Sequence, residues 1–184
     1  PKLKESGWGV VENSRVRRNF PITLGRIQGS GKRAQPLFAD FVLEFNGRKL
    51  AVIEAKKSSL NVGEGVAQAK EYAKKLQIDF TFATNGKEIY QIDMVTGKEK
   101  SVKCFPTPEE VWNKTFRTQN EWKDKFNAIP FGGNKKPWFY QEIAINKTMD
   151  AIAEDKKRLL LTLATGTGKT TIAFQIVWKL FYSK

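Results

Sequence analysis

Two carboxylates and a lysine stand close together in the first third of the chain, at Asp40, Glu54 and Lys56. Glu54 and Lys56 are two residues apart, so on a strand their side chains share one face. We expect Asp40, Glu54 and the backbone carbonyl of Ala55 to hold Mg²⁺, which prefers oxygen ligands. The ion would lower the pKa of a bound water and offset phosphodiester charge, while Lys56 stabilises the charge that develops during attack. The alternative is a set of solvated hairpin charges, because a D…ExK pattern is short and common.

A hairpin is the element that must bring these residues together. Residues 37–45 alternate as a strand, Asn46-Gly47 is typical of a type I′ turn, and residues 48–55 form the return strand. Pairing about this turn places the segment around Asp40 opposite the segment around Glu54.

A second group of residues, rich in glycine and threonine, spans 164–171 with the sequence Ala-Thr-Gly-Thr-Gly-Lys-Thr-Thr. Glycines let backbone N–H groups approach phosphate oxygens at a helix N-terminus. We expect Lys169 to reach the β- and γ-phosphates of ATP and Thr170 to bind the accompanying Mg²⁺. Leu163 stands where the general phosphate-loop pattern has a glycine. The predicted ATP-binding residues of the loop are Thr165, Gly166, Thr167, Gly168, Lys169, Thr170 and Thr171.

This loop needs a strand before it and a helix after it. Residues 158–163 are predicted to form a short buried strand, and residues 171–181 an apolar helix. A further helix is predicted over residues 138–154. The chain ends shortly after the loop, without a Walker B pattern, so we expect the ATPase site to be incomplete in these 184 residues.

The composition indicates a polyanionic partner, most simply nucleic acid. There are 32 Lys+Arg against 19 Asp+Glu, a net charge of +13. The absence of histidine excludes Ser-His-Asp and Cys-His hydrolases and His-ligated zinc, and the single Cys104 excludes an intramolecular disulfide. No apolar run approaches the ~18 residues of a membrane span.

We expect non-specific binding of duplex DNA with strong salt dependence, through residues 15–18 and Lys32-Arg33; the alternative is a solvated basic surface.

Three regions are predicted along the chain. Residues 1–104 form an α/β module with a mixed sheet flanked by helices, residues 105–136 a helical linker, and residues 137–184 the start of a phosphate-loop domain. In the linker, Thr107 is expected to cap a helix that opens at Pro108. Its aromatic residues, Trp112, Phe116, Trp122 and Phe126, are interpreted as packing residues, with base stacking as the alternative. The other elements predicted in the first module are a helix over 1–7, strands over 8–11, 80–83 and 88–94, and a helix over 62–76.

The hairpin residues resemble the core of PD-(D/E)xK nucleases. The helix that follows carries Gln68 and Tyr72, which match the QxxxY element of the type I restriction-enzyme and RecB-like branch. The resemblance implies that these two residues contact DNA or support the active site; the alternative is an exposed glutamine and a packed tyrosine. Many family members also place an acid on the first helix, for which Glu5 or a residue before Pro1 would be the equivalent.

The phosphate loop resembles that of superfamily 2 helicases, which have the pattern A-x-x-G-x-G-K-T. Residues 138–141, Trp-Phe-Tyr-Gln, resemble the Q-motif of the same motors. That resemblance implies that Gln141 hydrogen-bonds the adenine edge of ATP.

A PD-(D/E)xK core followed by the truncated start of a RecA-like motor resembles the N-terminal part of the R subunit of type I restriction-modification enzymes, and the likeness extends to the linker residues 131–134. It implies a motor that translocates duplex DNA with ATP, Mg²⁺-dependent cleavage, partner M and S subunits that modify and recognise DNA, and the cytoplasm of a bacterium or archaeon.

Two other readings remain open from the sequence. One is a different ATP-dependent nuclease-helicase, of type III or repair type, against which the order of the modules argues. The other is a degenerate nuclease fold that only grips DNA or a partner, against which the intact set of Asp40, Glu54 and Lys56 argues.

Overall fold

The computed structural model describes residues 1–23, 35–116, 121–134 and 136–183. The chain divides into two compact units, Pro1–Arg117 and Thr118–Lys184, and each is described by itself. The predicted basic loop with Lys32-Arg33 lies outside the described residues.

A six-stranded sheet forms the centre of the first unit, with its strands in sequence order from β1 to β6. Neighbouring strands are antiparallel except β3 and β4, which are parallel. The parallel pair is joined by a crossover of a short 3₁₀ turn, η1, and helix α2, as parallel pairing requires. The bounds are β1 Ser14–Thr23, β2 Leu37–Phe45, β3 Arg48–Ala55, η1 Val62–Gly65, α2 Val66–Leu76, β4 Phe80–Thr84, β5 Ile89–Asp93 and β6 Glu99–Val102.

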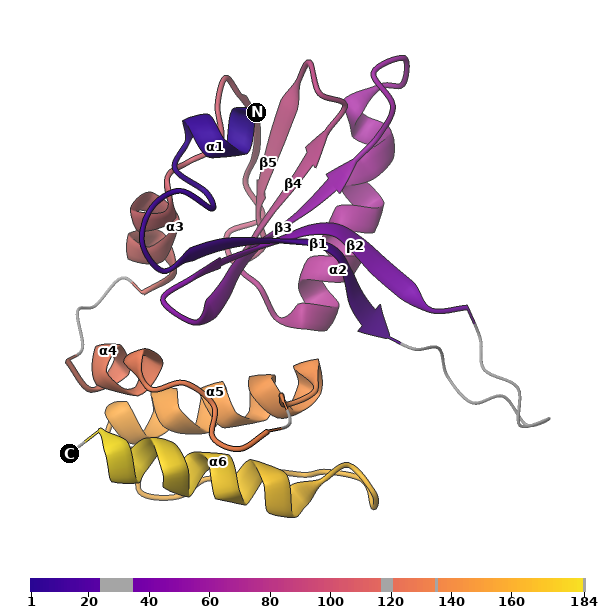
Figure 1. The fold of residues 1–184 in the computed structure, drawn as a ribbon. Helices are drawn as coiled ribbons and strands as arrows, with labels where there is room; N and C mark the ends of the chain where they lie inside the picture. The colour runs from indigo at the N-terminus through magenta and orange to yellow at the C-terminus, as the bar shows by residue number, and fades with distance from the viewer. Residues whose placement is uncertain (24–34, 117–120, 135, 184) are drawn as a thin grey trace. The chain divides into compact units, whose positions relative to one another are not determined.

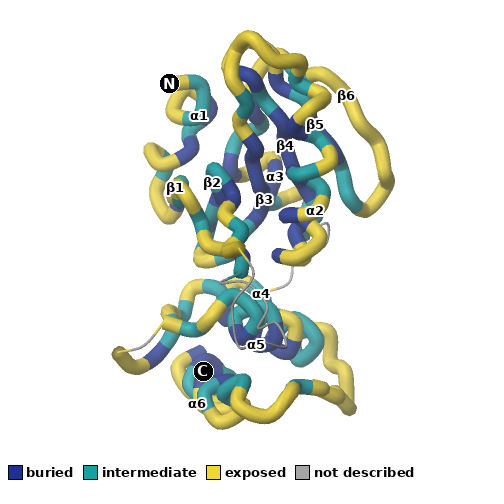
Figure 2. Tube along the Cα trace, turned by 90° about the vertical axis from the view of Figure 1, so that its right-hand side faces the viewer, coloured by how far each residue is buried: buried dark blue, intermediate teal, exposed yellow. Residues whose placement is uncertain are grey.

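Helices cover both faces of this sheet (Figure 1). Helix α2 packs on one face, where the Thr81 hydroxyl donates to the carbonyls of Val52 and Ala69. Helices α1, Lys2–Glu5, and α3, Pro108–Thr115, lie on the other face (Figure 1). The central strands β3 and β4 are consequently buried along most of their length (Figure 2).

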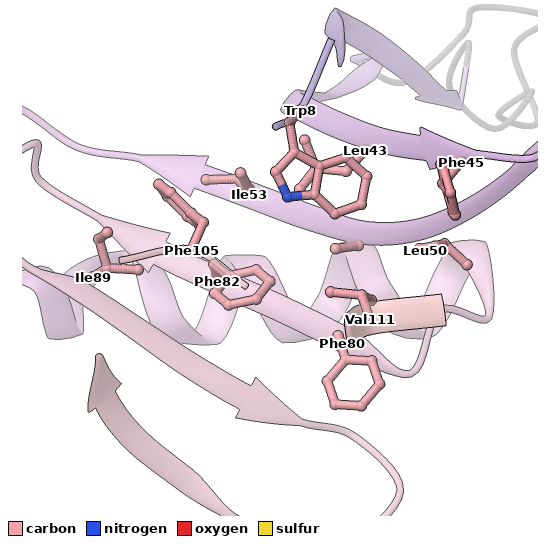
Figure 3. Packing of buried hydrophobic residues seen from close by; sticks show 11 residues of the cluster. Trp8, Leu43, Phe45, Leu50, Ile53, Phe80, Phe82, Ile89, Phe105 and Val111 are labelled. Carbon is pink, nitrogen blue, oxygen red and sulfur yellow. The ribbon is translucent and has the colours of Figure 1, made fainter. Parts of the chain in front are cut away.

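The main core of this unit lies on the α1/α3 face (Figure 3). Its centre is Trp8, which is fully buried and whose indole N–H donates to the Pro106 carbonyl at 2.7 Å. That bond satisfies the polar atom of a large buried ring and ties two distant segments together. The other members of the cluster are Leu43, Phe45, Leu50, Ala51, Ile53, Phe80, Phe82, Ile89, Phe105 and Val111.

Local signals in the sequence explain several boundaries. Asn46 and Gly47 both have positive φ, as a type I′ turn requires. Thr107 and Glu110 form the reciprocal capping box that starts α3, which confirms the predicted cap. The predicted hairpin strands and the helix over 62–76 are also confirmed, the latter as η1 followed by α2.

The strand predicted over residues 8–11 is wrong. Gly7 and Gly9 have positive φ, and the amides of Val10 and Val11 both donate to the Gly7 carbonyl, so this segment is a tight turn. Strand β1 follows it, and neither β1 nor β6 was predicted, because their polar side chains conceal the alternation that marks a strand.

Among its described residues, the second unit has three helices: α4 Glu121–Ala128, α5 Phe139–Ala153 and α6 Lys169–Tyr182. The predicted helices over 138–154 and 171–181 are thus confirmed. Their shared core contains Phe126, Ala144, Ile145, Met149 and Ile172. No described helix of the chain has the length and apolar character needed to cross a bilayer.

The strand predicted over residues 158–163 is wrong, since this segment has no regular structure and Leu160 is 87% exposed. A strand exists only through hydrogen bonds to a neighbour, and every strand among the described residues belongs to the sheet of the first unit.

Candidate active site

The register of the β2–β3 hairpin brings the two predicted carboxylates together. Phe41 pairs with Ile53, so Asp40 and Glu54, the next residues along each strand, oppose each other. A regular two-residue hairpin would instead pair Asp40 with Ile53. Leu50 is an extra residue in β3, and this bulge shifts the pairing by one. Because a shift of one residue reverses the face of every side chain, the bulge places both carboxylates on one face.

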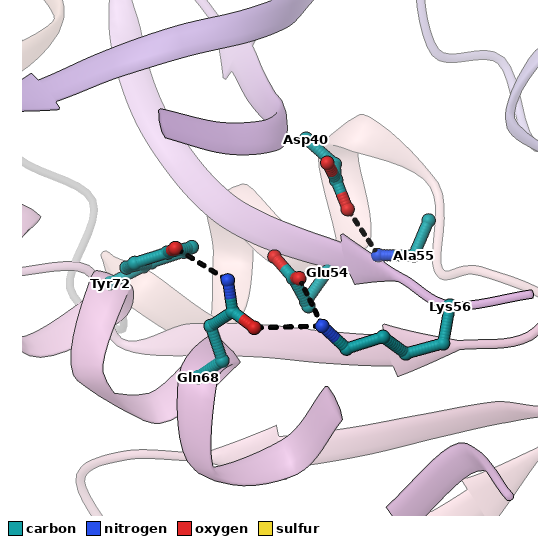
Figure 4. Close-up of polar contacts among 6 residues, drawn as sticks. All are labelled: Asp40, Glu54, Ala55, Lys56, Gln68 and Tyr72. Atoms are coloured by element: carbon teal, nitrogen blue, oxygen red, sulfur yellow. Dashed lines mark hydrogen bonds and ion pairs between the residues drawn. The ribbon is translucent and has the colours of Figure 1, made fainter. Parts of the chain in front are cut away.

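Asp40 is fixed to the end of β3. Its Oδ2 atom accepts a hydrogen bond from the backbone N–H of Ala55 at 2.7 Å (Figure 4). The Lys56 N–H donates to the Thr84 carbonyl at 2.8 Å, which extends the β3–β4 pairing past Ala55. Backbone bonds therefore hold Glu54, Ala55 and Lys56 in extended conformation beside Asp40.

The Lys56 ammonium is the centre of a hydrogen-bonded chain (Figure 4). It donates to Glu54 Oε1 at 2.8 Å and to Gln68 Oε1 at 2.7 Å. The Gln68 amide donates in turn to the Tyr72 hydroxyl at 2.5 Å. Gln68 and Tyr72 are four residues apart and therefore share one face of α2. The side chains of all four residues are thus brought into one network, with the lysine between glutamate and amide.

Glu54 is 3% exposed, and its Oε2 atom is buried with no hydrogen-bond partner in the described part of the chain. Burial raises the pKa of Glu54 above its ordinary 4.5; the hydrogen bond from Lys56 lowers it, and the charge of Asp40 raises it. The pKa of Lys56 is raised, first by its hydrogen bond to Glu54.

These features fit a cation between Asp40 and Glu54. The Lys56 ammonium balances one negative charge at Glu54 Oε1, but Glu54 and Asp40 together carry two, and the buried Oε2 atom has no donor among the described residues. Such an arrangement is costly unless a further positive charge accompanies it. Within the described ranges there is no cluster of three or more His, Cys, Asp or Glu side chains. The available protein ligands are therefore two carboxylates and a backbone carbonyl, a set that suits Mg²⁺, which keeps several waters. Glu5 does not join this pair: it belongs to α1, on the other face of the sheet (Figure 1).

Two further residues support the site and were not predicted. A Cβ at Gly65 would lie 3.4 Å from Lys56 Cγ and 3.5 Å from Glu54 Cγ, so the start of α2 packs directly on both side chains. Asn85, 7% exposed, donates to the Leu60 carbonyl at 2.9 Å and anchors the segment between Lys56 and α2. No local pattern in the sequence indicated this long-range bond.

The predicted phosphate loop, residues 164–171, leads into α6 in the second unit. Gly166 and Gly168 have positive φ, which glycine adopts without strain. The Lys169 ammonium donates to the Ala164 carbonyl at 3.2 Å, and the Thr167 hydroxyl donates to the same carbonyl at 2.7 Å. The loop is thus closed by its own side chains, while Thr165, Gly166, Lys169 and Thr170 are exposed and Thr171 is half-buried.

Gln141 connects α5 to this loop. Its Oε1 atom accepts from the Trp138 N–H at 2.9 Å, and its Nε2 atom donates to the Thr167 carbonyl at 2.9 Å. A Cβ at Gly168 would lie 2.4 Å from Gln141 Nε2, so any other residue there would displace this amide as well as strain a backbone with positive φ. The structure therefore brings together two motifs that lie 26 residues apart.

Comparison with known proteins identifies restriction-enzyme subunits as relatives of this chain. Residues 12–106, more than half of the chain, match the family described as type I restriction enzyme R protein N terminus (HSDR_N). Residues 134–184 match the family described as type III restriction enzyme, res subunit. The chain is 36% identical, over its whole length, to the type I restriction enzyme EcoAI endonuclease subunit of Escherichia coli. It is 24% identical, over 80% of its length, to the EcoKI endonuclease subunit of Escherichia coli strain K12.

A solved structure shows the same fold. It is the fragment structure of a putative HsdR subunit of a type I restriction enzyme from Vibrio vulnificus YJ016, with a TM-score of 0.89 and 40% identity over 100% of this chain and 36% of that chain. The chain spans 24% and 17% of the two curated relatives. From these matches, the chain belongs to the R-protein family of type I restriction enzymes.

Proposed function

We propose that the first unit is a Mg²⁺-dependent endonuclease module of the PD-(D/E)xK type. Asp40, Glu54 and the backbone carbonyl of Ala55 would hold the ion, which supplies a water of lowered pKa and offsets phosphodiester charge. The observation that carries the proposal is the buried Glu54 carboxylate beside Asp40, whose Oε2 atom has no donor in the described ranges of the chain. A carboxylate kept in such a position fits a binding role better than a structural one.

Lys56 would act on the phosphate. Its ammonium is positioned to stabilise the negative charge that develops on the phosphodiester oxygens during hydrolysis. Gln68 and Tyr72 would orient it, because the amide oxygen of Gln68 accepts one of its three N–H bonds and the Tyr72 hydroxyl fixes the amide. The contacts favour active-site support by these two residues over direct binding of DNA.

For the second unit we propose the Q-motif and Walker A loop of a superfamily 2 motor. The exposed loop from Thr165 to Thr171 would surround the phosphates of ATP, with Lys169 on the β- and γ-phosphates and Thr170 on Mg²⁺. Lys169 would exchange its bond to Ala164 for a phosphate oxygen. Gln141 would hydrogen-bond adenine through its side-chain amide. Its contact with Thr167 would link the adenine site to the loop.

For the whole protein, the family supports a DNA-cleaving, ATP-dependent translocating subunit that works with M and S subunits on duplex DNA in the cytoplasm of a bacterium or archaeon. The type III match covers only the motor residues, and the nuclease residues precede them, which favours the type I assignment.

The test is DNA cleavage by the complete native protein with ATP and Mg²⁺. Lys56→Ala should lower the rate about 10²- to 10³-fold, as expected when one group that stabilises transition-state charge is removed. Lys57→Ala is the matched control, since Lys57 is the adjacent lysine and is exposed. Cleavage by Lys56→Ala at the rate of the Lys57→Ala variant would refute the assignment.

A further inference from the structure

The arginines of β1 divide between the two faces of the sheet. Arg17 forms an ion pair with Glu44, 2.9 Å from Nε to Oε2, diagonally across the β1–β2 pair. Arg18 pairs directly with Phe41, and its guanidinium lies over that ring at 5.9 Å. Consecutive arginines therefore point to opposite faces, as the pleat requires, and Arg15 shares the face of Arg17.

The register shows which face carries the candidate active site. Arg17 pairs with Val42, and Val42 pairs with Val52, so these three residues form one row across three strands. Glu54 lies two residues beyond Val52 on the same face, opposite Asp40. Arg15 and Arg17 are thus on the face of the two carboxylates, whereas Arg18 is on the face of the main core.

Arg17 lies close to the site, Arg15 lies further along the same face, and both side chains are accessible. At about 3.3 Å of rise per residue and 4.8 Å between strands, the Cα of Arg17 is about 8 Å from that of Asp40, and Arg15 is about 7 Å further along the strand. β1 is the edge strand of the sheet, and Arg15 is exposed. The ion pair with Glu44 uses one of the five N–H donors of the Arg17 guanidinium, which leaves the fork able to bind another oxygen.

We propose that this face of β1, defined by Arg15 and Arg17, binds the phosphate backbone of the DNA duplex whose scissile phosphodiester lies at Asp40 and Glu54. The inference rests on the proposed nuclease function. Guanidinium groups match phosphate oxygens in geometry and charge, and an edge strand beside a phosphodiester site meets neighbouring phosphates of the same backbone. Arg18 carries the same charge on the same strand and lies on the wrong face to take part.

The experiment compares single-charge variants of the chain. Binding of a fluorescent duplex of arbitrary sequence is measured by anisotropy in EDTA, over a series of salt concentrations. Arg15→Gln should raise the Kd about fivefold at low salt and reduce the slope of log K against log salt by about 0.9, the value for one lost phosphate contact. Arg18→Gln, the matched control, should change neither by more than the experimental error.

A loss in Arg18→Gln equal to that in Arg15→Gln would overturn the proposal, because binding would then depend on charge and not on the face. Unchanged binding in both variants would overturn it as well. Circular dichroism of each variant confirms that the fold is retained. Arg15→Gln should leave Mg²⁺ binding intact. Failure of the parent chain to bind Mg²⁺ would count against the proposed nuclease function. The DNA affinities of Arg15→Gln and Arg18→Gln test the β1 face separately.

Discussion

The two units hold their candidate functional groups in different ways. In the first unit, Asp40, Glu54 and Lys56 are positioned by sheet register and by backbone bonds between neighbouring strands. In the second unit, side chains hold the predicted phosphate loop: Gln141 donates to the Thr167 carbonyl, and Thr167 and Lys169 donate to the Ala164 carbonyl. Because backbone bonds already fix the first site, its activity should be most sensitive to loss of a functional side chain. ATP binding at the second site should be most sensitive to a change in the conformation of the loop. Substitutions that act selectively on one or the other sharpen this comparison.

After Lys56→Ala, the largest effect is expected at Gly168. An alanine there would combine positive φ with a Cβ placed 2.4 Å from Gln141 Nε2, and the loop or the glutamine must move. A cost of about 2–3 kcal/mol corresponds to a loss of ATP affinity of about 30- to 160-fold in the complete native protein. Equilibrium binding of a fluorescent ATP analogue checks this.

Gly166→Ala is the matched control for that substitution. Gly166 has φ +80°, but a Cβ there would meet nothing within 4 Å. Only the backbone cost of about 1–2 kcal/mol should remain, so its ATP affinity should exceed that of Gly168→Ala. Equal losses in the two variants would show that contact with Gln141 is unimportant for the loop.

A smaller effect is expected at Gln68. Gln68→Leu removes the acceptor that orients the Lys56 ammonium, and hydrogen bonds to charged groups contribute about 1.5–3 kcal/mol. Cleavage by the complete native protein should fall at least about tenfold, while Mg²⁺ binding is unchanged. If instead DNA binding falls and the cleavage rate at saturating DNA does not, Gln68 contacts DNA and does not support the lysine.

Tyr72→Phe should have a milder effect on the same reaction. The substitution keeps the buried ring and removes only the hydroxyl that accepts from Gln68. A neutral hydrogen bond contributes about 1 kcal/mol, so the cleavage rate should fall about fivefold. A larger loss than in Gln68→Leu would contradict the order Lys56, Gln68, Tyr72 in the network.

The smallest effect is on stability, and it depends on pH. Because the folded-state pKa of Glu54 is raised, the folded chain holds this proton more tightly than the unfolded chain. The associated stabilisation is fully present below pH 4.5 and is lost as pH rises through the folded pKa. Without Mg²⁺, the unfolding free energy of the parent chain should therefore fall relative to that of Glu54→Gln as pH rises above 4.5. Urea titrations at pH 4 and pH 7 measure this, and a difference independent of pH would contradict it.

The hairpin illustrates how far the sequence predicts the first site. Alternating side chains and the Asn46-Gly47 turn predicted both strands, and pairing about the turn predicted that the segments around Asp40 and Glu54 lie opposite each other. The turn alone would have paired Asp40 with Ile53. The bulge at Leu50 shifts the register by one residue, and no local signal in the sequence marks it. The support from Gly65 and Asn85 was also unpredictable, since both contacts depend on tertiary structure.

In the second unit, local sequence patterns predicted two helices correctly and one strand wrongly. The order of glycines and threonines predicted the loop, and the helix pattern predicted α5 and α6. The strand over 158–163 was predicted from its apolar run alone, but strand formation depends on a partner that apolar character cannot supply.

Divalent-metal titration by calorimetry tests the central claim most directly. The account predicts that the parent chain binds Mg²⁺ or Mn²⁺, that Asp40→Ala and Glu54→Gln lose this binding, and that Lys56→Gln keeps it. Equal binding in the parent chain and both carboxylate variants would contradict the account.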